Sequence, residues 1–281
     1  MTVGAAERVV DQASCDRAIT ADRRETKYLI AADRSADLVR TLRRELAAHR
    51  FTGQGANLLP EAQNFSTTIY FDTKSHALLR SAHENAEENI KIRAREYYDL
   101  HPSLAELATD PVQIVRYQPR LWFELKRRER DRTVKHRLQI DKARLLDFLR
   151  SEPTLTAASA QQPGEAWAIK SVCRALGEPL EASVLVNYRR QAFQDTSGEL
   201  RVTVDLDLAF YAPPADLWTR TQALVRGTFG APRAVDRICL VEVKQRTATP
   251  AWLERALSAA GGQLTPFSKF LRAGQAVYGR L

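Results

Sequence analysis

Cysteine is scarce in this chain of 281 residues: Cys15, Cys173 and Cys239 lie far apart and form no CxxC pair. An odd number of scattered cysteines argues against a disulfide framework and against a zinc site, and it fits a reducing compartment such as the cytoplasm. The start of the chain mixes charged and small residues without an apolar stretch, so we expect no signal peptide. No run approaches the roughly 18 apolar residues of a membrane-spanning helix, so we expect a soluble, cytoplasmic protein.

Acidic residues are outnumbered by basic ones, with 34 Asp and Glu against 42 Lys and Arg, a net charge of +8 and a pI of about 9.6. This balance indicates an anionic partner, which could be nucleic acid, an anionic membrane surface or a phosphorylated molecule. Hydrophobic residues make up 44% of the chain, enough for a sizeable core in one large domain.

The pattern of apolar residues predicts one domain over 23–281, preceded by a flexible lead-in over 1–22. Period-two alternation predicts about eight strands, at 25–30, 65–72, 89–98, 121–130, 133–140, 183–194, 201–211 and 238–245. Helical periodicity predicts helices at 33–49, 141–150, 165–176, 252–260 and 267–277. The stretches 151–164 and 212–236 are expected to be loops or insertions.

Several of the predicted strands carry charges on one face and apolar side chains on the other. In the stretch 91–95, Lys91, Arg93 and Arg95 share one face, whereas Ile92 and Ala94 share the other. The same alternation recurs in 121–128, 201–208 and 240–246. For any single strand, the simplest interpretation is an ordinary sheet with its charged face in water.

Considered together, these strands favour a closed barrel with an unusual interior. The charged faces are dominated by Arg and Lys, and several amphipathic helices are available to cover the apolar faces. If the helices lie outside, the basic residues line the inside of a barrel of about eight strands. Confined like charges repel, so such an interior requires an anion, and the planar fork of Arg suits phosphate oxygens. We therefore expect an α+β fold with an antiparallel barrel, a basic tunnel and helices packed outside.

Eight short motifs then occur in a characteristic order. They are Glu25-Thr26-Lys27-Tyr28, Tyr70-Phe71-Asp72-Thr73, Lys91-Ile92-Arg93-Ala94-Arg95, Glu124-Leu125-Lys126, Tyr188-Arg189-Arg190-Gln191-Ala192-Phe193, Arg201-Val202-Thr203-Val204-Asp205, Val241-Glu242-Val243-Lys244 and Phe267-Ser268-Lys269-Phe270. Over roughly 25–275 the chain resembles the VTC domain, the polyphosphate-polymerase domain of vacuolar transporter chaperone complexes, which belongs to the triphosphate tunnel metalloenzymes. Each motif alone is weak, but eight in order are fairly specific.

The resemblance implies an enzyme that transfers the γ-phosphate of ATP to a growing inorganic polyphosphate chain with the help of Mn²⁺ or Mg²⁺. ATP and polyphosphate are then the partners, nucleic acid is not, and a separate membrane protein could receive the product. By position in the motifs, the implied catalytic residues are Arg93, Arg95, Lys126, Arg190 and Arg201. The implied phosphate-binding residues are Lys27, Lys91, Lys135, Lys244, Ser268 and Lys269. The implied metal ligand is Glu242, with Glu124, Asp205 and Asp207 as possible helpers.

Other interpretations of the same residues stay open. Glu242 could simply pair with Lys244 or an arginine, and Ser268 could be only a helix N-cap. A hydrolase of triphosphates or nucleotides would need the same anion site, and a non-catalytic sensor of polyphosphate or inositol phosphates would keep it without turnover. A nucleic-acid binder is disfavoured, because the basic residues alternate with aliphatic ones instead of stacking aromatics.

Overall fold

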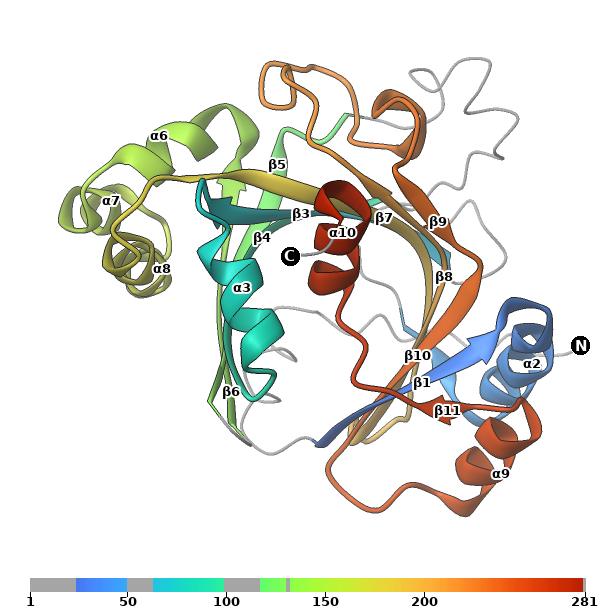
Figure 1. Cartoon of the computed structure of the whole chain (residues 1–281). Coiled ribbons are helices and arrows are strands. Elements are labelled where there is room, and N and C mark those ends of the chain that lie inside the picture. Colours follow the sequence, from blue (N-terminus) through green and yellow to red (C-terminus); the bar gives the residue numbers. More distant parts are fainter. Residues whose placement is uncertain (1–23, 50–62, 99–116, 130–131, 280–281) are drawn as a thin grey trace, which may run out of the picture.

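One antiparallel sheet dominates the computed structural model, which describes residues 24–49, 63–98, 117–129 and 132–279 (Figure 1). The predicted lead-in over 1–22 lies outside the described residues. The sheet has eleven strands, and its main path runs β11-β1-β10-β8-β7-β3-β4-β5-β6, while β2 pairs with β7 and β9 pairs with β8. The strands are β1 (Arg24–Ala31), β2 (Ala47–Ala48), β3 (Gln63–Thr73), β4 (Glu88–Tyr98), β5 (Arg120–Glu129), β6 (Arg132–Asp141), β7 (Leu180–Gln194), β8 (Leu200–Tyr211), β9 (Ala234–Asp236), β10 (Ile238–Gln245) and β11 (Gln263–Leu264).

All eight predicted strands are present, and the three additional strands have two or three residues each. The α-helices are α2 (Ser35–Glu45), α3 (Ala77–Glu84), α6 (Leu145–Arg150), α7 (Pro153–Ser159), α8 (Pro163–Ala175), α9 (Ala251–Ala259) and α10 (Lys269–Tyr278). Short 3-10 turns cover Ala32–Arg34, Lys142–Arg144 and Arg226–Thr228. Helix α7 lies in the stretch 151–164, which was wrongly predicted to be a loop.

Helix α3 was also not predicted, because the side chain that caps its first turn, Asp72, lies in the preceding strand. The Asp72 carboxylate at the end of β3 accepts hydrogen bonds from the backbone N–H groups of Thr73, Leu78 and Leu79, at 2.8, 2.8 and 3.0 Å. The N–H groups of Leu78 and Leu79 lie in the first turn of α3 and have no partner within the helix, so a carboxylate there stabilises that turn. The cap is six residues before Leu78, too far for a local capping pattern to predict.

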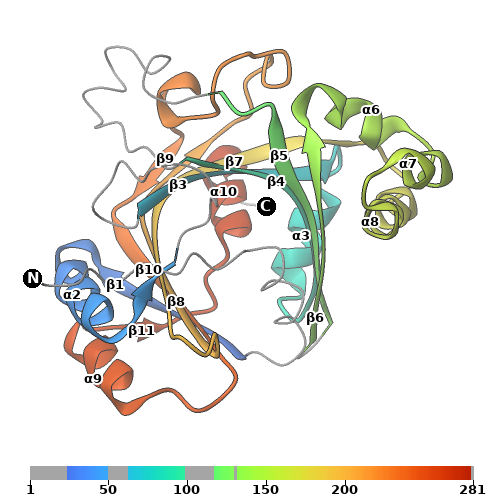
Figure 2. The same cartoon turned by 180° about the vertical axis from the view of Figure 1, so that it is seen from behind.

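The sheet curves strongly, and helices cover two parts of its convex face (Figures 1 and 2). Helices α2 and α9 supply Leu38, Leu42, Leu253 and Leu257 to a core with the apolar side chains of β1, β8 and β10. Helices α6 and α8 contribute to a second core, with the apolar face of β4 and β5 and with α3. The predicted alternation is confirmed, since Ile92, Ala94, Phe123 and Leu125 are all almost completely buried.

The predicted closed barrel is wrong, because among the described residues the strands at the two ends of the path, β11 and β6, do not pair with each other. The predicted placement of every helix outside the sheet is also wrong for α10. Phe270 of α10 stacks on Tyr70 with ring centroids 4.8 Å apart, and Tyr70 pairs with Arg93 on the charged face. The sheet therefore curves around a helix, which occupies space that a closed barrel would give to side chains or ligand (Figure 1).

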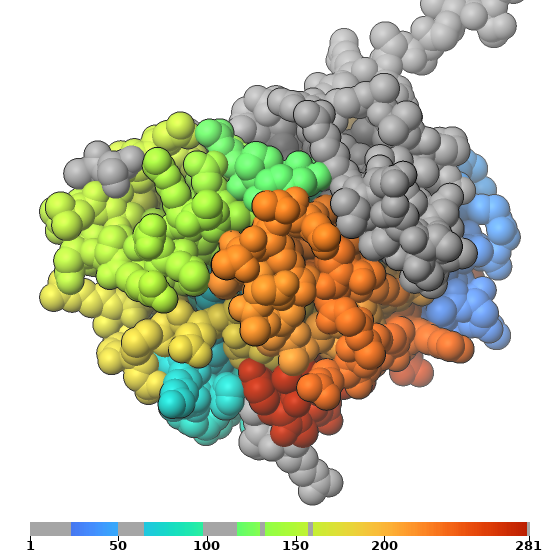
Figure 3. Space-filling model, turned by 90° about the horizontal axis from the view of Figure 1, so that it is seen from above, coloured from blue at the N-terminus to red at the C-terminus, as the bar shows by residue number. Residues whose placement is uncertain are grey.

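The segment between β8 and β10 adds another outer element. Trp218 from this segment stacks on Phe71, with ring centroids 5.8 Å apart, and Leu224 accepts a hydrogen bond from Thr67 at 2.5 Å. In Figure 3 this segment, in orange, forms a central part of one face of the molecule, beside the yellow-green region that includes α6. In the parts of the chain that the structure describes, no helix combines the length and the hydropathy needed to cross a membrane.

Candidate functional site

The pairing register brings basic side chains from neighbouring strands into rows across the concave face of the sheet. Lys91 of β4 lies opposite Lys126 of β5, which lies opposite Lys135 of β6. The next row consists of Arg93, Glu124 and Arg137. We call the following residues the charged cluster: Lys27, Lys91, Arg93, Arg95, Lys126, Lys135, Arg137, Arg190, Arg201, Lys244 and Lys269, with the carboxylates Glu25, Glu124, Asp205 and Glu242.

Glu124 forms the first of three acidic centres in the charged cluster. Its side chain is fully buried and accepts contacts from Arg93 at 2.7 Å, Lys135 at 3.0 Å, Arg137 at 3.2 Å and Arg95 at 4.0 Å. Burial alone would raise the pKa of Glu124, but these four cations hold it well below the usual range. Glu124 is therefore ionised and in contact with four cations of the protein itself.

Asp205 forms the second acidic centre, between β7, β8 and α10. Arg190 binds its two oxygens at 2.5 and 2.6 Å, and Lys269 approaches to 2.6 Å. Burial opposes the charge, yet Arg190 and Lys269 lower the pKa of Asp205. A bidentate arginine pair of this kind fixes the guanidinium plane, so Arg190 is held in place before any ligand arrives.

Asp207 does not join Asp205, although alternation places both on one face. Its backbone has a left-handed φ of 55°, next to an irregularity in the pairing of β7 with β8. Its carboxylate instead contacts Arg189 at 3.1 Å, and Arg189 pairs with Leu206 of the convex face. The structure thus places Arg190, and not Arg189, in the charged cluster.

Glu25 and Glu242 form the third acidic centre, among lysines of β1, β5 and β10. Lys27 lies 3.4 Å from Glu25 and 4.0 Å from Glu242, while Lys244 lies 3.6 Å from Glu25 and 3.7 Å from Glu242. Lys126 of β5 reaches Glu25 of β1 at 3.6 Å across the concave face, although the two strands lie near opposite ends of the strand order. These contacts are longer than those at Glu124 and Asp205, and the side chains are partly exposed.

Lys91 makes no ion pair with the other described residues. Burial, followed by the charges of Lys126, Lys27 and Arg93, lowers the pKa of Lys91 to about 7. Burial also lowers the pKa of Lys126, to about 8, although Glu25 opposes the shift. Partly buried amines that repel one another in this way would gain from an added anion.

The remaining predicted phosphate contacts lie around the same face. Arg201 donates to Gln194 at 2.9 Å, and Arg95 donates to Thr68 at 3.2 Å. Ser268 accepts a hydrogen bond from the backbone N–H of Leu271 at 3.4 Å, so it does act as an N-cap of α10. Lys27 donates to the carbonyl of Phe267, just before that helix, at 3.1 Å.

Three members of the site were not singled out from the sequence: Glu25, Arg137 and Tyr188. Arg137 contacts Glu124, and its guanidinium lies 3.7 Å from the centre of the Trp122 ring. The Tyr188 hydroxyl is fully buried without a hydrogen-bond partner among the described residues. Burial opposes its ionisation, but Arg190, Arg95 and Lys269 lower the pKa of Tyr188 to about 8. Glu25 and Tyr188 stand in motifs quoted above, and Arg137 is two residues from Lys135. Alternation with Lys27, Arg190 and Lys135 could therefore have indicated all three.

A metal ion could be held here only with help from the ligand. The described residues contain no group of three or more His, Cys, Asp or Glu side chains arranged to bind a metal. Burial opposes the charge of Glu242, but Lys244, Lys269 and Lys27 hold its pKa well below the usual range, so its carboxylate is ionised. Mg²⁺ in phosphate-handling sites takes one or two carboxylates and draws its other ligands from phosphate and water. The Glu242 carboxylate, together with oxygens from phosphate and water, therefore fits a hard cation such as Mg²⁺.

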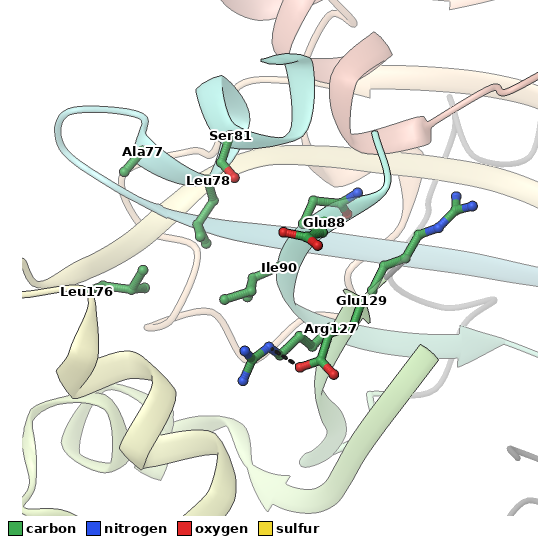
Figure 4. A pocket seen from close by; sticks show the side chains of 10 residues that line it. Ala77, Leu78, Ser81, Glu88, Ile90, Arg127, Glu129 and Leu176 are labelled. Carbon is green, nitrogen blue, oxygen red and sulfur yellow. Dashed lines mark ion pairs between the residues drawn. The ribbon is translucent and has the colours of Figure 1, made fainter. Parts of the chain in front are cut away.

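A separate pocket of about 630 Å³ lies between α3 and the ends of β4 and β5 (Figure 4). Leu78, Ile90 and Leu176 form its apolar part, and Arg127 pairs with Glu129 at 2.8 Å beside it. None of the predicted site residues lines this pocket.

Comparison with known proteins places the chain in a family. No curated protein matches it. Among solved structures, a proposed adenylate cyclase from Vibrio parahaemolyticus is similar at 12% identity and a TM-score of 0.37, over 86% of this chain and 88% of that one. A chain of the Mediator head module of Schizosaccharomyces pombe is similar at 8% identity and a TM-score of 0.39, over 85% and 91%. The model of the VTC domain matches residues 22–278, so this chain belongs to the VTC domain family.

Proposed function

We propose that this protein is a metal-dependent polyphosphate polymerase, which transfers the γ-phosphate of ATP to the end of a polyphosphate chain. The observation that carries the proposal is the charged cluster, in which eleven basic side chains face four carboxylates on the concave face of a VTC domain. Phosphoryl transfer requires positioning of the reacting groups and stabilisation of charge, and little covalent chemistry from the protein.

The arginines are suited to hold the reacting phosphates. Arg93, Arg95 and Arg190 are buried or half-buried and are fixed by Glu124 or Asp205, so they present their remaining N–H groups with little loss of side-chain freedom. Donors fixed in advance stabilise the developing charge of a transition state more than mobile ones do. Arg201 lies on the same face of β8 as Asp205 and would extend this group.

The chain would supply one carboxylate for a cation. Glu242 is the candidate ligand of Mn²⁺ or Mg²⁺, and a bound cation would neutralise charge on the transferring phosphate. The nucleophile is a phosphate oxygen of the growing chain, which is already ionised. No protein side chain therefore has to act as nucleophile. The basic side chains would hold ATP and the polyphosphate chain in position despite the repulsion between these two anions.

The contacts of Glu242 also favour a second candidate, a non-catalytic sensor of polyphosphate or inositol phosphates. Glu242 lies between Lys27 and Lys244, an arrangement in which the carboxylate could serve only to balance lysines. A triphosphate hydrolase is the third candidate, because water could replace the phosphate nucleophile at the same site.

The first experiment incubates the protein with ATP and Mn²⁺ or Mg²⁺, with and without a short polyphosphate primer, and resolves the products on a gel. We expect long chains from the native protein and a loss of about a hundredfold or more in Arg93→Ala and Glu242→Ala. Arg255→Ala and Glu254→Ala, exposed substitutions on α9, are the matched controls and should retain activity. Free phosphate without chains would identify a hydrolase. Tight polyphosphate binding without turnover, which survives Glu242→Ala, would identify a sensor.

A further inference from the structure

The Glu25 carboxylate is held differently from the other acidic centres of the charged cluster. Its Oε2 atom lies 3.6 Å from both Lys126 and Lys244, and its Oε1 atom lies 3.4 Å from Lys27. A strong ammonium–carboxylate hydrogen bond is about 2.7–2.9 Å long. Glu25 is therefore in charge contact with three lysines without a short hydrogen bond to any of them.

Glu25 is also accessible, unlike Glu124 and Asp205. Its side chain is 27% exposed, and the three lysines around it are between 24% and 35% exposed. The side chains of Glu124 and Asp205 are completely buried. A ligand on the concave face could replace Glu25 without unpacking a core.

The contact with Lys126 joins two separated parts of the open sheet. Glu25 is in β1, near one end of the strand order, whereas Lys126 is in β5, next to the last strand (Figure 1). The two strands do not pair, so this ion pair spans the concave face at the row of Lys91, Lys126 and Lys135. Glu25 contacts three ammonium groups there, of which Lys27 and Lys244 also contact Glu242, and Lys91 beside them has no ion pair among the described residues.

The lysine row is set apart from the arginines along the strand. On β4, Lys91 is two residues from Arg93 and four residues from Arg95, which corresponds to about 7 and 13 Å at the rise of an antiparallel strand. A triphosphate held by Arg93, Arg95 and Arg190 would occupy the arginine end, and only a longer chain would also cover the lysine end.

We propose that Glu25 occupies a phosphate position at the lysine end of the charged cluster, and that a polyphosphate chain binds there by displacing its carboxylate from Lys126 and Lys244. The proposal rests on the proposed function for its substrate class and adds a residue that determines chain-length specificity. Glu25 competes with the distal phosphates of a long chain and leaves a short triphosphate unaffected.

The test measures binding of tripolyphosphate and of long-chain polyphosphate by calorimetry, without turnover, to the native protein and to Glu25→Gln. The substitution keeps the size of the side chain and removes its charge. We expect long-chain affinity to rise about tenfold and tripolyphosphate affinity to stay within about twofold, as for a charge that opposes only the distal phosphates. Glu254→Gln, an exposed substitution with the same change in net charge, should alter neither affinity.

The outcomes separate this inference from the proposed function. Equal tightening for both ligands, or no tightening for the long chain, would overturn the role of Glu25 while leaving polyphosphate as the substrate. Failure of the native protein to bind either polyphosphate would overturn the proposed function itself. If Glu25→Gln does not fold, Glu25→Asp withdraws the carboxylate by one methylene and should produce a smaller gain, again only for the long chain. An unchanged long-chain affinity in Glu25→Asp would then overturn the inference.

Discussion

At the scale of single residues, Glu124 shows how the charged cluster tolerates its own repulsion. Four basic side chains from β4 and β6 converge on this one buried carboxylate, whose charge offsets the repulsion among them. The protein itself therefore supplies part of the negative charge that confined basic residues require. The acidic centres leave basic residues in excess, and this excess remains available to a phosphate chain.

Substitution of Glu124 by Gln should destabilise the fold strongly. It leaves Arg93, Arg95, Lys135 and Arg137 near one another without a counter-charge, and breaking a buried ion pair costs about 3–5 kcal/mol. Urea unfolding followed by circular dichroism measures the change. The control is Glu129→Gln, in an exposed pair with Arg127, which should cost no more than about 1 kcal/mol. Similar small losses for the two variants would contradict a central role for Glu124.

At the scale of elements, α10 connects the hydrophobic core to the charged cluster. Phe270 stacks on Tyr70 and is almost completely buried, while the adjacent Lys269 contacts Asp205. The first turn of α10 is thus held in place by the contact between Phe270 and Tyr70, and it presents the Lys269 cation to the concave face. Helical periodicity predicts the helix but not its location, because a C-terminal helix can cover either face of a sheet.

Phe270→Ala should therefore affect both stability and ligand binding. Loss of a buried phenyl ring costs about 3–5 kcal/mol, and freeing the start of α10 should weaken polyphosphate binding by displacing Lys269. Chemical unfolding gives the first quantity and calorimetry under folding conditions gives the second. Gln275→Ala, on the exposed side of the same helix, should change stability by no more than about 0.5 kcal/mol. Unchanged binding in a folded Phe270→Ala variant would show that α10 does not position Lys269 for the ligand.

At the scale of the whole molecule, two lysines on the neighbouring strands β4 and β5 should make polyphosphate binding depend on pH. The pKa of Lys91 is lowered to about 7 and that of Lys126 to about 8, so both lose protons as the pH rises through this range. A polyanion binds the protonated amines, so binding at pH 8 should take up protons, and affinity should fall as the pH rises. Each lysine that must be protonated can contribute up to about tenfold per pH unit.

Calorimetry in two buffers with different ionisation enthalpies measures this proton uptake directly. Lys91→Arg keeps its charge throughout the range and should make the decline shallower. The exposed Lys74→Arg substitution is the matched control and should reproduce the native profile. Binding at pH 8 without proton uptake would show that these lysines are already protonated in the free protein.

The sequence by itself determined which segments are strands and which face of each strand is charged. Both properties depend on local alternation, so Ile92 and Phe123 could be assigned to the core, and Lys91 and Arg93 to the opposite face, without knowledge of the fold. The order of motifs likewise indicated the family. Short elements such as α3 were not predicted, because the carboxylate of Asp72 that caps the helix belongs to the preceding strand.

Only the tertiary structure decided how the strands and charges meet. Pairing between residues far apart in the sequence left the sheet open, put α10 on its concave side and moved Asp207 away from Asp205 through a backbone irregularity. It also assigned each carboxylate its cations, with Glu124 and Asp205 enclosed and Glu25 accessible between two parts of the sheet. Alternation along a strand specifies the face of a side chain but not its neighbours across the fold, because those depend on curvature and long-range packing.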